Sequence, residues 1–195
     1  YQKIAGKSLV EININKARKI KQIKNIIVVY NKKDTQRIRS LNLKNVKLIV
    51  GGKSRQQSAY NALKYLIKIN GASKVLIHDV ARPNFSLKLL NLIIRNMKSA
   101  RAVVPTMNIM DAVKQKIDSS LNEYVLGKNR DNLFLTQTPQ AFNLKEIYHL
   151  HKTNAANYKD DDISLYMDLN KVQFIEGEKN NFKITDWSDF QNLKG

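Results

Sequence analysis

The sequence contains no cysteine, and no apolar stretch in it is long enough to cross a bilayer. Without cysteine, neither a disulfide nor a thiolate metal site can form, and the cytosol is the default compartment. Residues 1–6 lack the apolar region of a signal peptide. The chain also lacks an initiator Met, so we expect it to begin inside a longer one. From these absences we expect neither a disulfide scaffold nor a membrane partner.

Acidic residues are scarce, because 16 Asp and Glu stand against 34 Lys and Arg, and the formal net charge is +18. Such a charge suggests a polyanionic partner. However, Lys, Asn and Ile are abundant together, and the basic residues are spread along the whole chain. We find no arginine-rich arm, zinc-finger spacing or aromatic RNP-like strand. We therefore favour a compositional bias that also suits anionic substrates and expect no nucleic-acid partner, with a nucleic-acid-binding protein as the last-ranked alternative.

Apolar runs alternate with helical patterns over the first half of the chain, whose 195 residues suffice for one domain. Strands are predicted at residues 26–30, 46–50, 75–78 and 102–105. Helices are predicted from a capping box at Ser8 and Glu11 to about residue 20, near residues 35–41, after Ser54 and after Ser86. This alternation predicts an α/β, Rossmann-like fold with a mostly parallel twisted sheet and helices on both faces.

The pattern changes after Pro105, where short apolar fragments lie between polar turns. We predict a β-arm or hairpin over about residues 107–137, with a turn at 118–120, although a long irregular loop would fit the same residues. An isolated ribbon is marginal in water, so we expect the arm to pack on another subunit. Helices near 144–152 and 162–169, strands near 172–174 and 182–184, and a helix from Asp186 follow.

The most informative segment is residues 75–83, VLIHDVARP. A buried strand ends at His78 and Asp79, and Arg82 and Pro83 follow. Ligands of open α/β sheets bind beyond the carboxyl ends of strands. An acid and an arginine placed there can hold a metal and a phosphate, although an ordinary solvated ion pair explains them equally well.

A second candidate is the glycine pair Gly51 and Gly52, which closes a strand and precedes a helix with Arg55 and Ser58 on its first turn. It is not a P-loop, because that motif needs a glycine where Lys47 stands. The glycines allow close approach to a flat ligand, and the helix N-terminus presents free amides. A plain tight turn with a serine cap is the simpler alternative.

Other candidates are weaker. His149 and His151 lie two apart and do not form a zinc pair on one helix face, and His78 fits a structural role better than a catalytic one. The acidic run at residues 160–162 could bind a metal but fits a helix N-terminus better. No serine-hydrolase elbow is present.

Several of these residues recur together in one known family. The motifs stand at residues 51–58 (GGKSRQQS), 78–83 (HDVARP), 138–142 (TPQAF), 161–164 (DDIS) and 176–185 (EGEKNNFKIT). In order and spacing, they resemble the 2-C-methyl-D-erythritol 4-phosphate cytidylyltransferases of the non-mevalonate isoprenoid pathway. The resemblance covers nearly the whole chain. A related family that acts on ribitol 5-phosphate shares most of these motifs and is the alternative.

The resemblance implies transfer of CMP from CTP to methylerythritol 4-phosphate with release of pyrophosphate. It implies Mg²⁺ as cofactor, with Asp79 facing the metal, and a homodimer formed through the β-arm. Lys183 and Arg130 are the implied catalytic residues, and Arg130 would reach the substrate of the neighbouring subunit. The implied nucleotide contacts are Gly51, Gly52, Arg55, Ser58, Asp79 and Ala81. The implied sugar-phosphate contacts are Arg82, Ala112, Arg130, Thr138 and Lys183.

The chain also departs from the family. We expect a single nucleotidyltransferase domain over residues 1–195 that lacks the family's first strand and glycine-rich loop, together with the Arg and Lys that they supply. That strand is central in the family's sheet, so its loss predicts a gap with unsatisfied backbone groups. Ala112 and Asp160 replace family threonines, which weakens the implied sugar contacts. A non-catalytic nucleotide-binding remnant is therefore a further alternative.

Overall fold

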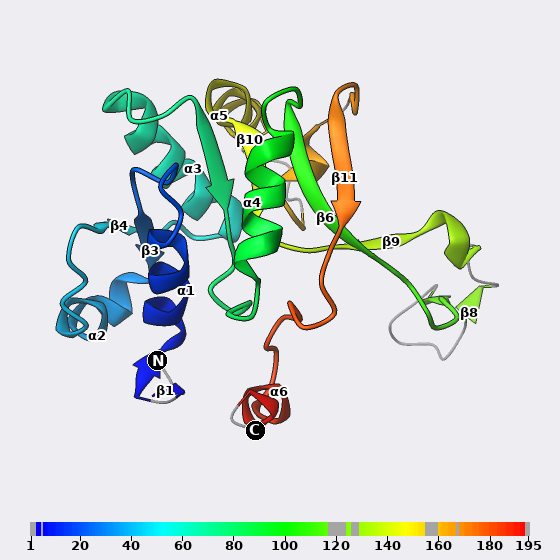
Figure 1. The fold of residues 1–195 in the computed structure, drawn as a ribbon, viewed down its shortest axis with the longest axis horizontal. Helices are drawn as coiled ribbons and strands as arrows, with labels where there is room; N and C mark the ends of the chain where they lie inside the picture. Colours follow the sequence, from blue (N-terminus) through cyan, green and yellow to red (C-terminus); the bar gives the residue numbers. More distant parts are fainter. Residues whose placement is uncertain are drawn as a thin grey trace.

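The computed structural model describes residues 3–4, 6–116, 124–125, 129–154, 160–166 and 168–193. Its main sheet has the strand order β11 (Val172–Glu176), β6 (Ala102–Asn108), β10 (Gln140–Asn143) and β5 (Lys74–Ile77), and β9 (Phe134–Thr136) pairs with the far end of β6 (Figure 1). Strands β6 and β11 are parallel, whereas β10 is antiparallel to both β5 and β6. Strand β10 was not predicted.

Helices cover both faces of this sheet. Ala102 and Val104 of β6 pack with buried residues of α3 (Arg55–Lys68) and α5 (Leu144–Thr153). Val103, between them, packs with the buried face of α4 (Leu87–Asn96). Successive strand residues point to opposite faces, so β6 contributes side chains to the hydrophobic core on each side of the sheet. The predicted Rossmann-like α/β fold is confirmed, but the main sheet is mixed rather than mostly parallel, because β9 and β10 pair antiparallel with their neighbours.

The helix starts lie where the predicted caps stand. Helix α1 (Leu9–Arg18) begins with the capping box of Ser8 and Glu11. Ser54 and Ser86 accept hydrogen bonds from backbone amides in the first turns of α3 and α4, and Asp186 does so for α6 (Trp187–Asn192). These bonds satisfy amides that have no partner inside the helix.

The remaining two long strands form a sheet of their own. Strand β3 (Ile27–Tyr30) pairs in parallel with β4 (Lys47–Val50), and η1 (Lys32–Asp34) and α2 (Thr35–Ser40) connect them. Among the described residues, β3 and β5 share no hydrogen-bonded ladder.

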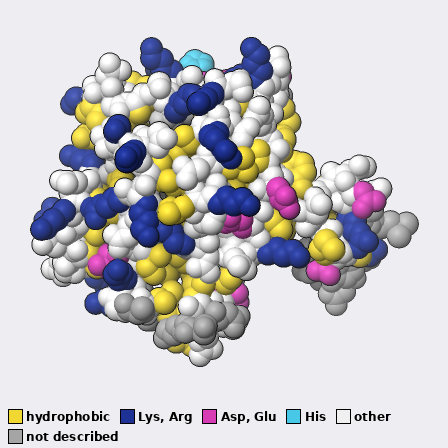
Figure 2. All heavy atoms as spheres, in the orientation of Figure 1, with side chains coloured by type: hydrophobic (Ala, Val, Ile, Leu, Met, Phe, Trp, Pro, Cys, Tyr) yellow, Lys and Arg dark blue, Asp and Glu magenta, His cyan; other side chains and the backbone are white. Residues whose placement is uncertain are grey.

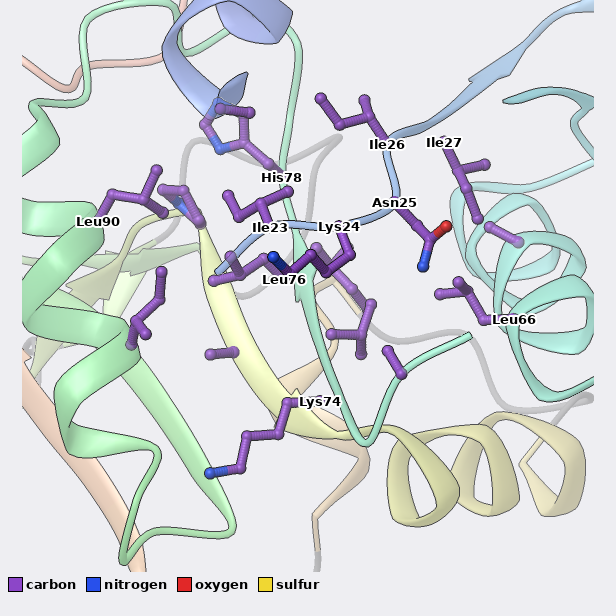
Figure 3. Close-up of a pocket in the computed structure, with 18 of the residues that line it drawn as sticks. Ile23, Lys24, Asn25, Ile26, Ile27, Leu66, Lys74, Leu76, His78 and Leu90 are labelled. Atoms are coloured by element: carbon purple, nitrogen blue, oxygen red, sulfur yellow. The ribbon is translucent and has the colours of Figure 1, made fainter. Parts of the chain in front are cut away.

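An apolar groove of about 930 Å³ separates β3 from β5. Figure 3 shows Ile27, Leu66, Leu76 and Leu90 around it, contributed by both strands and by α3 and α4. One end of the groove is bordered by His78 and Asp79. A gap of this kind was expected from the resemblance, and a further strand within it stays a prediction.

The region after β6 is an arm rather than an irregular loop. Strand β6 continues beyond the predicted end at Pro105, and β7 (Gln115–Lys116) pairs antiparallel with β8 (Tyr124–Val125). The arm also carries η2 (Arg130–Asn132), and Figure 1 shows it extending from the body. The predicted turn at 118–120 lies outside the described residues, and contact with a second subunit stays a prediction.

Two predictions near the C-terminus were wrong. Instead of a helix over 162–169 there is a single turn, η3 (Ile163–Leu165), after which Tyr166 is extended. Ile163, Leu165 and Tyr166 are all buried. In a continuous helix, Ile163 and Leu165 would lie on different faces, so a single face could not bury all three residues. Residues 182–184 form no strand, and the Ile184 amide bonds instead to the Ala81 carbonyl.

A short antiparallel pair, β1 (Lys3–Ile4) with β2 (Lys7–Ser8), precedes α1 and was not predicted. Figure 2 shows Lys and Arg side chains over much of one face, interspersed with other side chains. Among the helices of the described residues, none has the length and apolar character needed to traverse a bilayer.

Candidate active site

A cluster of opposite charges lies where β4 and β5 end. Asp79 lies just beyond the end of β5, after His78, Arg55 is the first residue of α3, and Lys183 comes from the segment after β11. Asp79 Oδ2 lies 3.1 Å from Lys183 Nζ, and Asp79 Oδ1 lies 3.6 Å from Arg55 Nε. Two cations that are distant in sequence thus share one carboxylate at the carboxyl end of the sheet.

The cluster keeps Asp79 ionised. Burial alone would raise the pKa of Asp79, but Arg55 and Lys183 together hold that pKa below its ordinary value. Burial would likewise lower the pKa of Arg55, but the Asp162 and Asp79 carboxylates raise it. The site therefore holds a charged acid among cations.

Hydrogen bonds to the loop after β5 position the segment that carries Lys183. The Ile184 amide donates to the Ala81 carbonyl over 2.9 Å, and Arg82 donates to the Asn181 carbonyl over 2.8 Å. Asn181 is fully buried, and its side-chain amide donates to the Thr138 backbone carbonyl. The segment 181–184 is thereby fixed against both the 79–82 loop and the loop before β10.

His78 and Thr138 hold the backbone of Asp79. The Asp79 amide donates to Thr138 Oγ1, which lies 3.0 Å from His78 Nδ1. His78 Nε2 lies 3.0 Å from two acceptors, Asn13 Oδ1 and the Arg82 carbonyl, so we assign the proton to Nε2. Nδ1 then accepts the Thr138 hydroxyl proton. His78 has the structural role that its position predicted.

This arrangement makes stability depend on pH. Burial lowers the pKa of His78 from 6.5 to about 4. Between pH 6.5 and about pH 4, His78 binds a proton in the unfolded chain but stays neutral in the folded protein. The free energy of unfolding therefore falls as the pH decreases over this range. We expect His78 to account for a loss of about 2 kcal/mol between pH 7 and pH 5. Urea unfolding at both pH values, compared between the protein and His78→Gln, measures this share. An identical loss in the two proteins would contradict it.

The glycine pair is packed against the start of α3. The Gly51 amide donates to the Tyr30 carbonyl, and the Gly52 amide donates to Ser58 Oγ over 3.0 Å. A Cβ on Gly52 would lie 2.0 Å from the Gln57 side chain, so only glycine fits without displacement. Because both glycine amides are used internally, the carbonyls of this turn are its better candidates for ligand contact.

Two implied site residues are not part of the cluster. Arg130 and Ala112 are exposed on the arm, and the Arg130 guanidinium donates to the Met110 carbonyl. Figure 1 shows the arm leading away from the body that carries β4, β10 and α3. Within one subunit, therefore, these two residues do not join the others.

The acidic run lies at the N-terminus of a helical turn, which is the role that the sequence favoured over a metal cluster. Asp161 Oδ1 accepts from the Ser164 amide, so Asp161 rather than Asp162 caps the η3 turn. Asp162 is buried and contacts Arg55 and His151. The support that Asp162, His151 and Asn181 give to the site was missed, because no local pattern indicates a partner so distant in sequence.

The donor set limits which metal the site could take. Among the described residues there is no group of three or more His, Cys, Asp or Glu side chains arranged for a metal. Asp79 offers one carboxylate. Mg²⁺ is commonly held by one or two carboxylates together with substrate phosphates, so Asp79 fits a metal that arrives with a nucleotide.

Comparison with known proteins gives consistent matches. Residues 1–194 match the family described as 2-C-methyl-D-erythritol 4-phosphate cytidylyltransferase. A bifunctional enzyme IspD/IspF of Pelagibacter ubique is 44% identical over 99% of this chain and 51% of its own length. The enzyme named 2-C-methyl-D-erythritol 4-phosphate cytidylyltransferase of Dictyoglomus thermophilum is 35% identical over 98% of this chain and 86% of its own.

A solved structure agrees with these matches. The 4-diphosphocytidyl-2C-methyl-D-erythritol synthase of Anaerococcus prevotii superposes with a TM-score of 0.85 and 30% identity, covering 100% of this chain and 87% of that one. The chain spans about half the length of the Pelagibacter relative, and less of two other bifunctional relatives. With its motifs, fold and charged cluster in agreement, the chain belongs to the 2-C-methyl-D-erythritol 4-phosphate cytidylyltransferase family.

Proposed function

We propose that this chain transfers CMP from CTP to 2-C-methyl-D-erythritol 4-phosphate and releases pyrophosphate. The observation that carries the proposal is the cluster of Arg55, Asp79 and Lys183 beside the glycine turn, with Arg82 on the same loop as Asp79. Family membership indicates the reaction, and the cluster supplies the charges that it needs.

In this reaction a phosphate oxygen of methylerythritol 4-phosphate attacks the α-phosphorus of CTP. The new P–O bond forms in line as the bond to the bridging oxygen breaks, and pyrophosphate leaves with that electron pair. The attacking phosphate is already anionic, so no base is required, but two anions must meet. A pair of charges 4 Å apart interacts by about 4 kcal/mol near a protein surface. Positioned cations are therefore the main requirement.

We assign the roles by position. Lys183, about half exposed beside Asp79, would neutralise the α-phosphate and hold the incoming 4-phosphate. Arg82 and Ala81 would border the sugar phosphate, and Thr138 would hold the loop next to it. The carbonyls of Gly51 and Gly52 would contact cytosine, with Ser58 and Arg55 supporting the turn. Asp79 would supply one oxygen to Mg²⁺, which would screen the triphosphate charge when bound.

We propose that a second copy of the chain completes the site. Arg130 stands on the arm, away from the cluster of its own subunit. The arm and β9 expose apolar side chains, with Met110 78%, Leu135 57% and Phe134 46% exposed. Exposed apolar surface of this kind favours association. A homodimer that buries the arm could place Arg130 beside the partner's sugar phosphate.

The groove between β3 and β5 supports a further part of the proposal. Two strand edges face an apolar space whose end borders Asp79. We propose that a β-strand occupies it and leads into a phosphate-binding loop, as in the family. Such a strand would satisfy backbone groups on both sides.

Pyrophosphate release from CTP tests the function directly. We expect release with methylerythritol 4-phosphate and Mg²⁺, and much less with ribitol 5-phosphate. The ribitol alternative is not favoured, because the matching family and relatives carry the methylerythritol name. The assay is made on the chain alone and with a family strand and loop fused ahead of residue 1, and we expect the fusion to be faster. CTP binding by calorimetry without turnover in either form would contradict catalysis and indicate a nucleotide-binding remnant.

A further inference from the structure

A chain of buried polar contacts lies behind Arg55. His151 of α5 and Asp162, which precedes η3, are 2% and 1% exposed. His151 Nε2 lies 2.9 Å from Asp162 Oδ1, and Arg55 Nη2 lies 2.7 Å from Asp162 Oδ2. Each oxygen of one buried carboxylate thus has its own partner, and one of these partners is the arginine that faces Asp79.

The geometry of this contact restricts Arg55. A guanidinium is planar, so fixing one nitrogen sets the direction of the others. Asp162 holds Nη2, and Nε of the same group lies 3.6 Å from Asp79 Oδ1. If Nη2 lost its partner, the side chain of Arg55, which is 29% exposed, could turn toward solvent.

His151 restricts Asp162 in turn. A carboxylate oxygen only accepts, so His151 Nε2 carries the proton in this contact. His151 Nδ1 is buried and has no hydrogen-bond partner among the residues that the structure describes, so the imidazole is oriented by Asp162 and by packing. A buried carboxylate without partners is costly, and the two contacts together fix its plane.

We propose that Asp162 and His151 are positioning residues that hold Arg55 toward Asp79. They touch no substrate and act through Arg55, which orients the Asp79 carboxylate between itself and Lys183. The activity part of this inference rests on the proposed function. The structural part does not depend on it.

The first test is structural and needs no activity. In a crystal of Asp162→Asn, we expect the Arg55 guanidinium to turn away from Asp79, because the charge that holds Nη2 is gone. Asp168→Asn is the matched control, since it removes an exposed carboxylate 3.1 Å from Arg101. An Arg55 that still faces Asp79 in Asp162→Asn would overturn the inference.

The second test is a double-mutant cycle in the pyrophosphate assay. We expect Asp162→Asn to lower kcat about 10- to 100-fold with little change in KM for CTP, and to have no further effect in an Arg55→Gln background. Additive losses would show that Asp162 does not act through Arg55 and would overturn the inference. No turnover in the unaltered protein would contradict the proposed function instead, and the crystal comparison would then decide.

A second pair of variants covers the case in which Asp162→Asn does not fold. His151→Gln keeps a donor near the Nε2 position and is expected to retain near-normal kcat and the Arg55 orientation. His151→Leu removes the donor and is expected to lose both. Equal behaviour of the two variants would overturn the role of His151.

Discussion

Replacing Lys183 with alanine is expected to lower the rate of cytidylyl transfer about a thousandfold, the scale seen when a positioned charge-stabilising donor is removed. Lys183 is the exposed cation of the cluster, 3.1 Å from Asp79, and is placed to meet both phosphates. The loss should appear in kcat, because the charge is needed most where the two anions approach each other. Pyrophosphate release at saturating CTP measures it.

A matched control is available on the same segment. Lys179 is also exposed, and Lys179→Ala removes the same charge from the chain without touching Asp79. It should leave the rate nearly unchanged. Because Lys183 is about half exposed, its loss should change the free energy of unfolding by only about 0.5 kcal/mol. Normal turnover in Lys183→Ala would contradict the role assigned to Lys183 at the reacting phosphates.

Asp79→Asn is expected to have the second large effect. Asparagine keeps the size of the side chain, and the backbone amide of residue 79 can still donate to Thr138 Oγ1. The substitution removes the charge that contacts Arg55 and Lys183. The proposed ligand for Mg²⁺ is lost with it. We expect turnover to fall about 100-fold or more and the remaining rate to require a higher Mg²⁺ concentration. The rate as a function of Mg²⁺ concentration measures both.

The control for this variant removes a comparable charge elsewhere. Asp34 forms a surface ion pair with Arg37 at 3.4 Å, and Asp34→Asn should leave both the rate and its Mg²⁺ dependence unchanged. An Asp79→Asn protein with the Mg²⁺ dependence of the unaltered chain would show that Asp79 does not hold the metal.

Local features of the fold could be predicted from the sequence. The caps at Ser8, Ser54 and Ser86 involve residues only three positions away, and the strand runs are apolar enough to be unambiguous. Strand β10 could not be predicted, because Gln140 and Asn143 at its ends give no strand signal. Its register comes from pairing with β5 and β6, which are distant in the sequence.

In the site, too, local motifs could be predicted from the sequence, whereas contacts between distant residues could not. The sequence motifs identified Asp79, Arg82 and Lys183, and the structure brings them to one end of the sheet. The supports behind them were not identifiable, since the partners of a buried side chain such as Asp162 depend on tertiary packing. The turn at Ile163–Leu165 was mistaken for the start of a longer helix for that reason.

The groove has a consequence for how the protein folds. Because β3 and β4 share no ladder with the main sheet among the described residues, the two sheets are linked through helix packing and connecting chain alone. Such units tend to open separately, as foldons with different hydrogen-exchange protection. A strand that formed ladders with both β3 and β5 would join the two sheets into one cooperative unit. Completing the sheet and ordering the nucleotide site would then be thermodynamically the same event.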